Sequence, residues 1–199
     1  SIIGQKDEKG QIRVLGMGSN PSTGLRKGIV VDFESTIDSI EKAVSKAEQI
    51  ANHEVREVCV GITGGHMRSF NRRAAIEISN PMRGVDHSDI RRVHERAKTK
   101  GMPQGYEVIN FFPVEYYCDD ILIDNPEGRL CHKLEVICHI VTADVAAAQN
   151  LIRCIHMAGL KTSGILFECV ASSQAALNDN ERDLGVLLQH LLDLARIDV

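Results

Sequence analysis

The chain has 199 residues, of which 43% are hydrophobic and 25% charged, and its formal net charge is −4. This balance is typical of a globular protein with one ordinary domain or two small ones. The most alanine-rich stretch, Ala143 to Ala148, is too short to cross a bilayer, and Ser1 to Lys6 contains no apolar core of signal-peptide length, so we expect a cytoplasmic chain without a transmembrane segment.

The first third of the chain has the pattern of an α/β unit. Gln11 to Gly18 predicts a strand, and Ser19 to Gly28 is interpreted as a loop because proline and glycine recur in it. Asp32 is a good N-cap for a helix that continues to about Ala51, with apolar residues at helical spacing. Glu57 to Thr63 is nearly continuously apolar, which predicts a strand covered on both faces.

After Gly64-Gly65 the pattern changes. His66 to Ile78 predicts strands separated by an arginine-rich turn near Asn71, and Asp86 can cap a helix whose Ile90, Val93 and Ala97 face inward. Glu107 to Tyr117 predicts a strand, in which Pro113 belongs at an edge or a bulge.

The clearest predicted strand follows a turn at Asn125 to Gly128. Its alternating residues Leu134, Val136, Cys138 and Ile140 indicate one buried face. The segment from Gly65 to about Thr142 is therefore expected to contain a strand, a helix and two strands, inserted between the halves of a parallel α/β unit.

The last part of the chain is predicted to return to that unit. Thr142 is expected to cap a helix that ends at Gly159, and Gly164 to Ala171 predicts a buried strand. Leucines at helical spacing predict a final helix over Asp183 to Arg196. Its apolar face needs a partner, either a sheet edge of the same chain or a second copy.

Positive charge is concentrated between His66 and Lys100. This segment contains nine basic and four acidic residues, so its net charge is +5. Such a segment can bind nucleic acid, an acidic lipid surface or an acidic patch on a protein, or it can simply be a solvated helix face. Without an aromatic stacking platform, nucleic acid is the weakest of these alternatives. The candidate partner-binding residues are Arg68, Arg72, Arg73, Arg91, Arg92 and Arg96.

Glycine-rich stretches do not indicate a nucleotide site. Gly16-Met17-Gly18 is a fragment of a dinucleotide-binding fingerprint, but Asn20-Pro21 replaces the expected third glycine and helix start, which favours a plain turn. Gly61 to Gly65 follows a predicted strand, yet no Gly-Lys-Ser/Thr comes after it. We expect no catalytic and no cofactor-binding residues in this chain.

Candidate metal ligands are equally weak. Cys131-His132 and Cys138-His139 resemble zinc ligands, but neighbouring residues of a strand point to opposite faces. Asp119-Asp120 near Asp124 would bind a cation only if several of their oxygens converge on one point. Acidic residues directly after a strand are more often solvated loop residues. We expect no metal site, and we interpret the six cysteines as reduced, buried thiols.

One family shares the order and spacing of many of these segments. VLGMGSNPSTGLRKGIVVDFEST, from Val14 to Thr36, resembles the bacterial cell-division protein FtsA, with its strand ending in a glycine pair, Gly-x-x-Lys-Gly turn and Val-x-Asp before a helix. The resemblance extends from about Leu15 to Val186 without a large gap. Further matching segments are VREVCVGITGGHMRSFN, DIRRVHERAK, VINFFPVEYYCDD, IDNPEGRLCHKLEVICHIVTA, AAQNLIRCIHMAGLKTSGILFECVASSQAAL and DNERDLGV.

The resemblance implies a partial actin-like (ribonuclease-H-like) α/β domain with a small inserted α+β domain. FtsA proteins tether filaments of the tubulin-like FtsZ to the inner face of the membrane at the division septum, polymerise, and recruit later division proteins. By resemblance, residues 1–64 begin the actin-like domain, residues 65–142 form the inserted domain used for self-association and recruitment, and residues 143–199 return to the actin-like domain.

Several family features are not expected in this chain. In the family, the Asp-x-Gly-Thr loop and a second phosphate loop hold ATP and Mg. No segment of this sequence matches either loop, so we expect none of its residues to bind ATP. The half that docks FtsZ and the amphipathic membrane helix also find no counterpart. We therefore expect an interaction protein that is not an enzyme, without direct membrane insertion. The alternatives are a nucleotide-dependent actin-like ATPase and a basic nucleic-acid-binding module.

Overall fold

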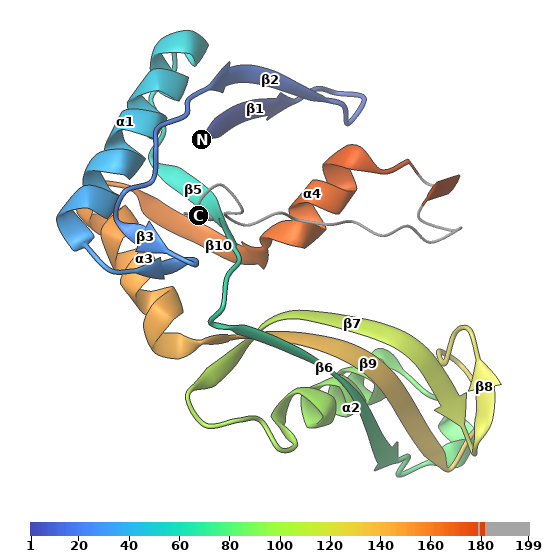
Figure 1. Cartoon of the computed structure of the whole chain (residues 1–199). Helices are drawn as coiled ribbons and strands as arrows, with labels where there is room; N and C mark the ends of the chain where they lie inside the picture. The colour runs from blue at the N-terminus through green and yellow to red at the C-terminus, as the bar shows by residue number, and fades with distance from the viewer. Residues whose placement is uncertain (179, 182–199) are drawn as a thin grey trace. The chain divides into compact units, whose positions relative to one another are not determined.

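The computed structural model describes residues 1–178 and 180–181, which divide into two compact units. The first unit joins Ser1–His66 to the described residues from Ala146 onward, and the second is the continuous segment Met67–Val145 (Figure 1). The final helix expected over Asp183 to Arg196 lies outside the described residues.

The first unit begins with two antiparallel hairpins and a long helix. In chain order they are β1 (Ile2–Lys6), β2 (Ile12–Met17), β3 (Leu25–Arg26), β4 (Ile29–Val30) and α1 (Phe33–Ala51). The strand expected over Gln11 to Gly18 is confirmed as β2. The N-cap is also confirmed, because the Asp32 carboxylate accepts a hydrogen bond from the Ser35 N–H. Sequence reasoning missed β1, and it missed β3, which lies inside the segment interpreted as a loop.

Two glycines let β2 lie directly against α1. A Cβ atom on Gly16 would lie 2.2 Å from the carbonyl oxygen of Ala47, and one on Gly18 would lie 2.0 Å from that of Ala43. Any larger residue would push the strand away from the helix. The glycine pair is therefore explained by packing between a strand and a helix.

The rest of the first unit is a parallel strand pair with its helices. These elements are β5 (Glu57–Ile62), α3 (Val145–Met157), β10 (Lys161–Phe167) and α4 (Glu168–Ala176). β5 and β10 pair in parallel, which confirms the expected α/β unit. Cover on both faces of β5 is wrong for the described part of the chain, since Glu57, Cys59 and Gly61 are exposed. The strand expected over Gly164 to Ala171 ends at Phe167, opposite the last residue of β5, and the chain turns into α4.

The second unit is a four-stranded antiparallel sheet with one helix on a face. Its elements are β6 (Met67–Glu77), a 3-10 turn η1 (Pro81–Arg83), α2 (His87–Thr99), β7 (Tyr106–Cys118), β8 (Ile121–Ile123) and β9 (Lys133–Asp144). The strand order is β6-β9-β7-β8, and α2 packs against β6 and β9 (Figure 1). The face of this sheet opposite α2 is called the far face below.

A core lies between α2 and the sheet. Leu134, Val136, Cys138 and Ile140 of β9 are fully buried, as their alternation predicts. From α2, the helix residues Val93 and Ala97 are buried and Ile90 is partly buried, which confirms the predicted inward face of this helix. The other buried members of the core are Ala74, Ile76, Ile78, Val85, Cys118, Ile123 and Cys131.

Two predictions within this sheet are wrong. The arginine-rich turn near Asn71 does not exist, because β6 is one unbroken strand in which Asn71 lies opposite His139 and their side chains are 2.7 Å apart. A polar run without glycine or proline can continue a strand that has one exposed face. Thr142 is not a helix cap, because β9 continues past it and its buried hydroxyl donates to the Arg68 carbonyl oxygen at 3.1 Å.

The irregular positions of β7 follow the chemistry of its residues. The register with β9 shifts between Pro113 and Glu115, which confirms the predicted bulge. Asp119 and Asp120 form the two-residue turn into β8, with φ angles of 48° and 67°. The Asp119 carboxylate accepts the N–H of His132 at 3.0 Å, and this hydrogen bond lowers the pKa of that carboxyl.

Candidate interaction surface

The six candidate arginines come from two elements that pack together. β6 carries Arg68, Arg72 and Arg73, and α2 carries Arg91, Arg92 and Arg96. Because successive strand residues point to opposite faces, Arg72 lies on the α2 side of the sheet and Arg73 lies on the far face. Their local contacts decide which of them can meet a partner.

Two arginines of β6 are used inside the unit. The Arg72 guanidinium donates to the carbonyl oxygens of Ala97 at 3.3 Å and Gly101 at 3.2 Å. A cation at this place stabilises the C-terminal end of α2. The Arg68 guanidinium lies 4.7 Å from the centre of the Tyr106 ring, within cation–π range. Both side chains therefore have structural roles.

On the far face, Glu135 lies between two cations. Its side chain is only 4% exposed, and it accepts hydrogen bonds from Arg73 and Lys133. Burial alone raises the pKa of Glu135, but the hydrogen bonds from Lys133 and Arg73 more than offset this, so the pKa lies below its usual value. Arg73 also lies 5.2 Å from the centre of the Tyr117 ring. The charge of Arg73 is thus largely balanced within the sheet.

Arg92 takes part in the N-terminal cap of α2. Asp86 and Asp89 form a capping box, and the Ser88 hydroxyl, together with the Asp89 N–H, lowers the pKa of Asp86 to about 2. The Asp89 side chain is 2% exposed and accepts from Arg92 at 2.9 Å and from Arg83 at 2.6 Å. Arg92 nevertheless remains 51% exposed, so part of its guanidinium faces solvent.

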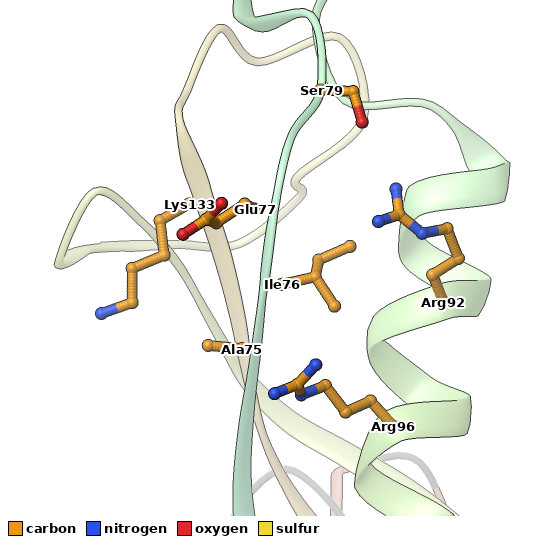
Figure 2. A pocket seen from close by; sticks show the side chains of 7 residues that line it. All are labelled: Ala75, Ile76, Glu77, Ser79, Arg92, Arg96 and Lys133. Atoms are coloured by element: carbon orange, nitrogen blue, oxygen red, sulfur yellow. The ribbon is translucent and has the colours of Figure 1, made fainter.

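Arg91 and Arg96 are different. Both are exposed, and within the described residues neither guanidinium has an ion pair or a hydrogen bond. Arg92 and Arg96 line a shallow hollow of about 500 Å³ between α2 and β6 (Figure 2). Its other lining residues are Ala75, Ile76, Glu77, Ser79 and Lys133. Sequence reasoning missed Lys133 and Ser79, because only the folded sheet pairs Lys133 of β9 with Glu77 of β6 and brings the end of β6 near Arg92.

Three further expectations concern metal ligands, cysteines and membrane spans among the described residues. In that part of the chain, no group of three or more His, Cys, Asp or Glu side chains is placed to hold a metal ion. The six cysteines have free thiols, but Cys59 is exposed, which corrects the expectation that all are buried. None of the described helices combines the length and apolarity that a membrane span requires.

Known proteins share both the inserted segment and the sequence around it. Residues 64–142 match the family model described as the SHS2 domain inserted in FtsA. The cell division protein FtsA of Pseudomonas aeruginosa is 35% identical over 94% of this chain and 45% of its own length. For FtsA of Borreliella burgdorferi the identity is 31%, with 94% and 46% covered, and for FtsA of Bacillus subtilis it is 30%, with 94% and 42% covered.

This chain is related to FtsA. The predicted resemblance is therefore confirmed, and the chain spans less than half the length of these FtsA relatives. Among solved structures, a chain of the PilM-PilN type IV pilus biogenesis complex aligns with a TM-score of 0.54 and 14% identity, covering 87% of this chain and 45% of that one. At this identity the likeness concerns the fold alone, and it agrees with the predicted partial actin-like fold.

Proposed function

We propose that this chain serves bacterial cell division as an interaction module. Its FtsA relatives are cell division proteins and match over 94% of its length. The inserted domain, residues 65–142, is the part that contacts other division proteins and further copies of the protein. Residues 1–64 and 143–199 form the partial actin-like domain around it. The protein acts at the cytoplasmic face of the membrane at the division septum, where FtsA proteins link to FtsZ.

One observation carries this proposal beyond the family relationship. Four of the six candidate arginines have partners inside the second unit, whereas Arg91 and Arg96 are exposed without a partner among the described residues. Exposed arginines are common in protein interfaces, where they form charge-assisted hydrogen bonds with carboxylates. The outer surface of α2 is thus the best-supported contact surface for a division protein.

The proposal also holds that the chain by itself is a binding protein and not an enzyme. Its basic surface is formed by the sheet and helix of the inserted domain, and we propose that this surface binds a partner and does not catalyse a reaction. Titration with ATP and Mg²⁺ tests the competing ATPase hypothesis. We expect no saturable heat, and micromolar binding would make the nucleotide-dependent hypothesis the leading one.

Localisation in dividing cells tests the interaction role. The chain is fused to a fluorescent protein and expressed in Pseudomonas aeruginosa, whose own FtsA is 35% identical. We expect enrichment at the division site, and we expect the double variant Arg91→Glu/Arg96→Glu to lose it. Arg13→Glu/Arg56→Glu, which reverses two exposed arginines of the first unit, is the matched control. Equal enrichment of both variants would rule out the surface on α2.

A further inference from the structure

The outer strand of the second unit has an unpaired edge. β6 has 11 residues and stands at one end of the strand order, so within the described residues it pairs with β9 on one side only. The backbone N–H and C=O groups of a strand edge are a template for a further strand. Many peptide-recognition domains bind an extended segment in this way.

The hollow between α2 and β6 lies along this edge. In Figure 2, the side chain of Ile76 points toward α2, while Ala75 points to the opposite side of the strand. The guanidinium groups of Arg92 and Arg96 extend from α2 back toward β6. An added strand would therefore lie with one row of its side chains beside these two arginines.

The spacing of the two arginines fits an extended partner. Arg92 and Arg96 are one helical turn apart, a rise of about 6 Å along the axis of α2. Side chains on one face of a strand are separated by about 6.7 Å. Two carboxylates at alternate positions of a strand running alongside α2 can therefore each meet one guanidinium.

The local charge selects the kind of partner. Lys133 adds a cation on the far face beside this edge, although it also contacts Glu135, and Glu77 is the acidic side chain of the lining. The segment from His66 to Lys100 carries +5 in total. A second copy would bring another segment of the same net charge to this edge, which disfavours pairing of two β6 edges. An acidic segment of a different protein meets no such repulsion.

We propose that the β6 edge binds an extended acidic segment of another protein, with carboxylates at alternate residues, as a fifth strand of the four-stranded sheet. This inference rests on the proposed interaction role and names the chemistry of the partner. Backbone hydrogen bonds to β6 provide the pairing, and Arg92 and Arg96 select acidic side chains at every second position.

A pair of synthetic peptides tests this docking mode on the whole chain. The first peptide alternates glutamate with valine, and the second has the same composition with its glutamates grouped at one end. We expect fluorescence titration to show at least tenfold tighter binding of the alternating peptide, equivalent to about 1.4 kcal/mol. Arg96→Glu is expected to weaken its binding at least tenfold, whereas the control Arg56→Glu is expected to leave it unchanged.

Amide hydrogen exchange provides a second readout. Strand addition protects amides of β6 from exchange, whereas simple ion pairing leaves them unchanged. Equal binding of the two peptides, unprotected β6 amides, or full competition by inorganic phosphate would each overturn the proposal. Loss of septal localisation in Arg91→Glu/Arg96→Glu without binding of the alternating peptide would reject this docking mode and keep the proposed function.

Discussion

Replacing Asp89 by asparagine tests the organisation of the basic helix most directly. The Asp89 carboxylate is 2% exposed, accepts the N–H of Asp86 at 3.2 Å, and binds both Arg83 and Arg92. Asparagine has nearly the same shape, so the change removes charge without opening a cavity. Its NH₂ group is a donor, and it faces guanidinium groups that are donors as well.

The expected loss of stability follows from these contacts. The capping hydrogen bond contributes about 1 kcal/mol. Each charge-assisted hydrogen bond to an arginine contributes up to about 1.5–3 kcal/mol, but Arg83 and Arg92 are 43% and 51% exposed and regain water when released. We therefore expect Asp89→Asn to lower the free energy of unfolding by about 2–4 kcal/mol.

Tyrosine fluorescence measures this effect in the correct unit. The chain has three tyrosines and no tryptophan, and Tyr106, Tyr116 and Tyr117 all lie in the second unit. Urea unfolding followed by this signal reports on that unit alone. The control lies in the same unit: Glu95→Gln removes a surface ion pair with Lys98 on α2, and it should cost less than about 0.5 kcal/mol.

The reasoning would be refuted by equal midpoints. If Asp89→Asn shifts the urea midpoint no more than Glu95→Gln does, the buried carboxylate does not organise the start of α2. A large loss of signal at zero urea would instead show that the unit depends on Asp89 for folding. The loss of stability would then exceed the predicted range, and the expected magnitude would be wrong.

Three further predictions concern other parts of the chain. Because the pKa of Glu135 is lowered in the fold, its contribution to stability is present above pH about 4.5 and is lost as pH falls through the folded-state pKa. In the variant Glu135→Gln, the urea midpoint should therefore change less with pH across this range. Gly18→Ala should destabilise the first unit by about 1–3 kcal/mol in unfolding followed by circular dichroism, and Gly65→Ala, with open space around it, should not. Maleimide labelling followed by mass spectrometry should modify Cys59 before the buried Cys138.

Each of these has a contrary outcome. An unchanged pH profile in the Glu135 variant would mean that another carboxylate controls acid stability. Equal midpoints for the two glycine variants would show that β2 can move away from α1 at little cost. Labelling of Cys138 in the native protein at the rate of Cys59 would contradict the packing of the core.

Local patterns predicted the fold well where one residue type has one strong structural preference. Asp86 capped a helix, Pro113 marked a bulge, and the alternation around Val136 indicated a strand with one buried face. The family resemblance then supplied the fold class, which no local pattern contains. Polar runs were less informative, since the stretch around Asn71 was interpreted as a turn and is a continuous strand.

The candidate surface could be predicted only in part, because the partners of charged residues are distant in the sequence. Arg72 binds carbonyl oxygens 25 and 29 residues away, and Arg73 binds Glu135, 62 residues away. Counting charges along the sequence finds all six arginines, yet it cannot separate the engaged ones from Arg91 and Arg96. That distinction requires the packing of α2 on the sheet.

The strand pairing at the ends of the second unit has a consequence for how such a chain can change. Met67 at the start of β6 lies opposite Ala143 near the end of β9, so the segment begins and ends at neighbouring positions, about 5 Å apart. A short turn joining β5 to α3 could close this gap. The segment can therefore be exchanged or altered as one piece. Its binding surfaces can diversify while the strands outside it keep their own pairing.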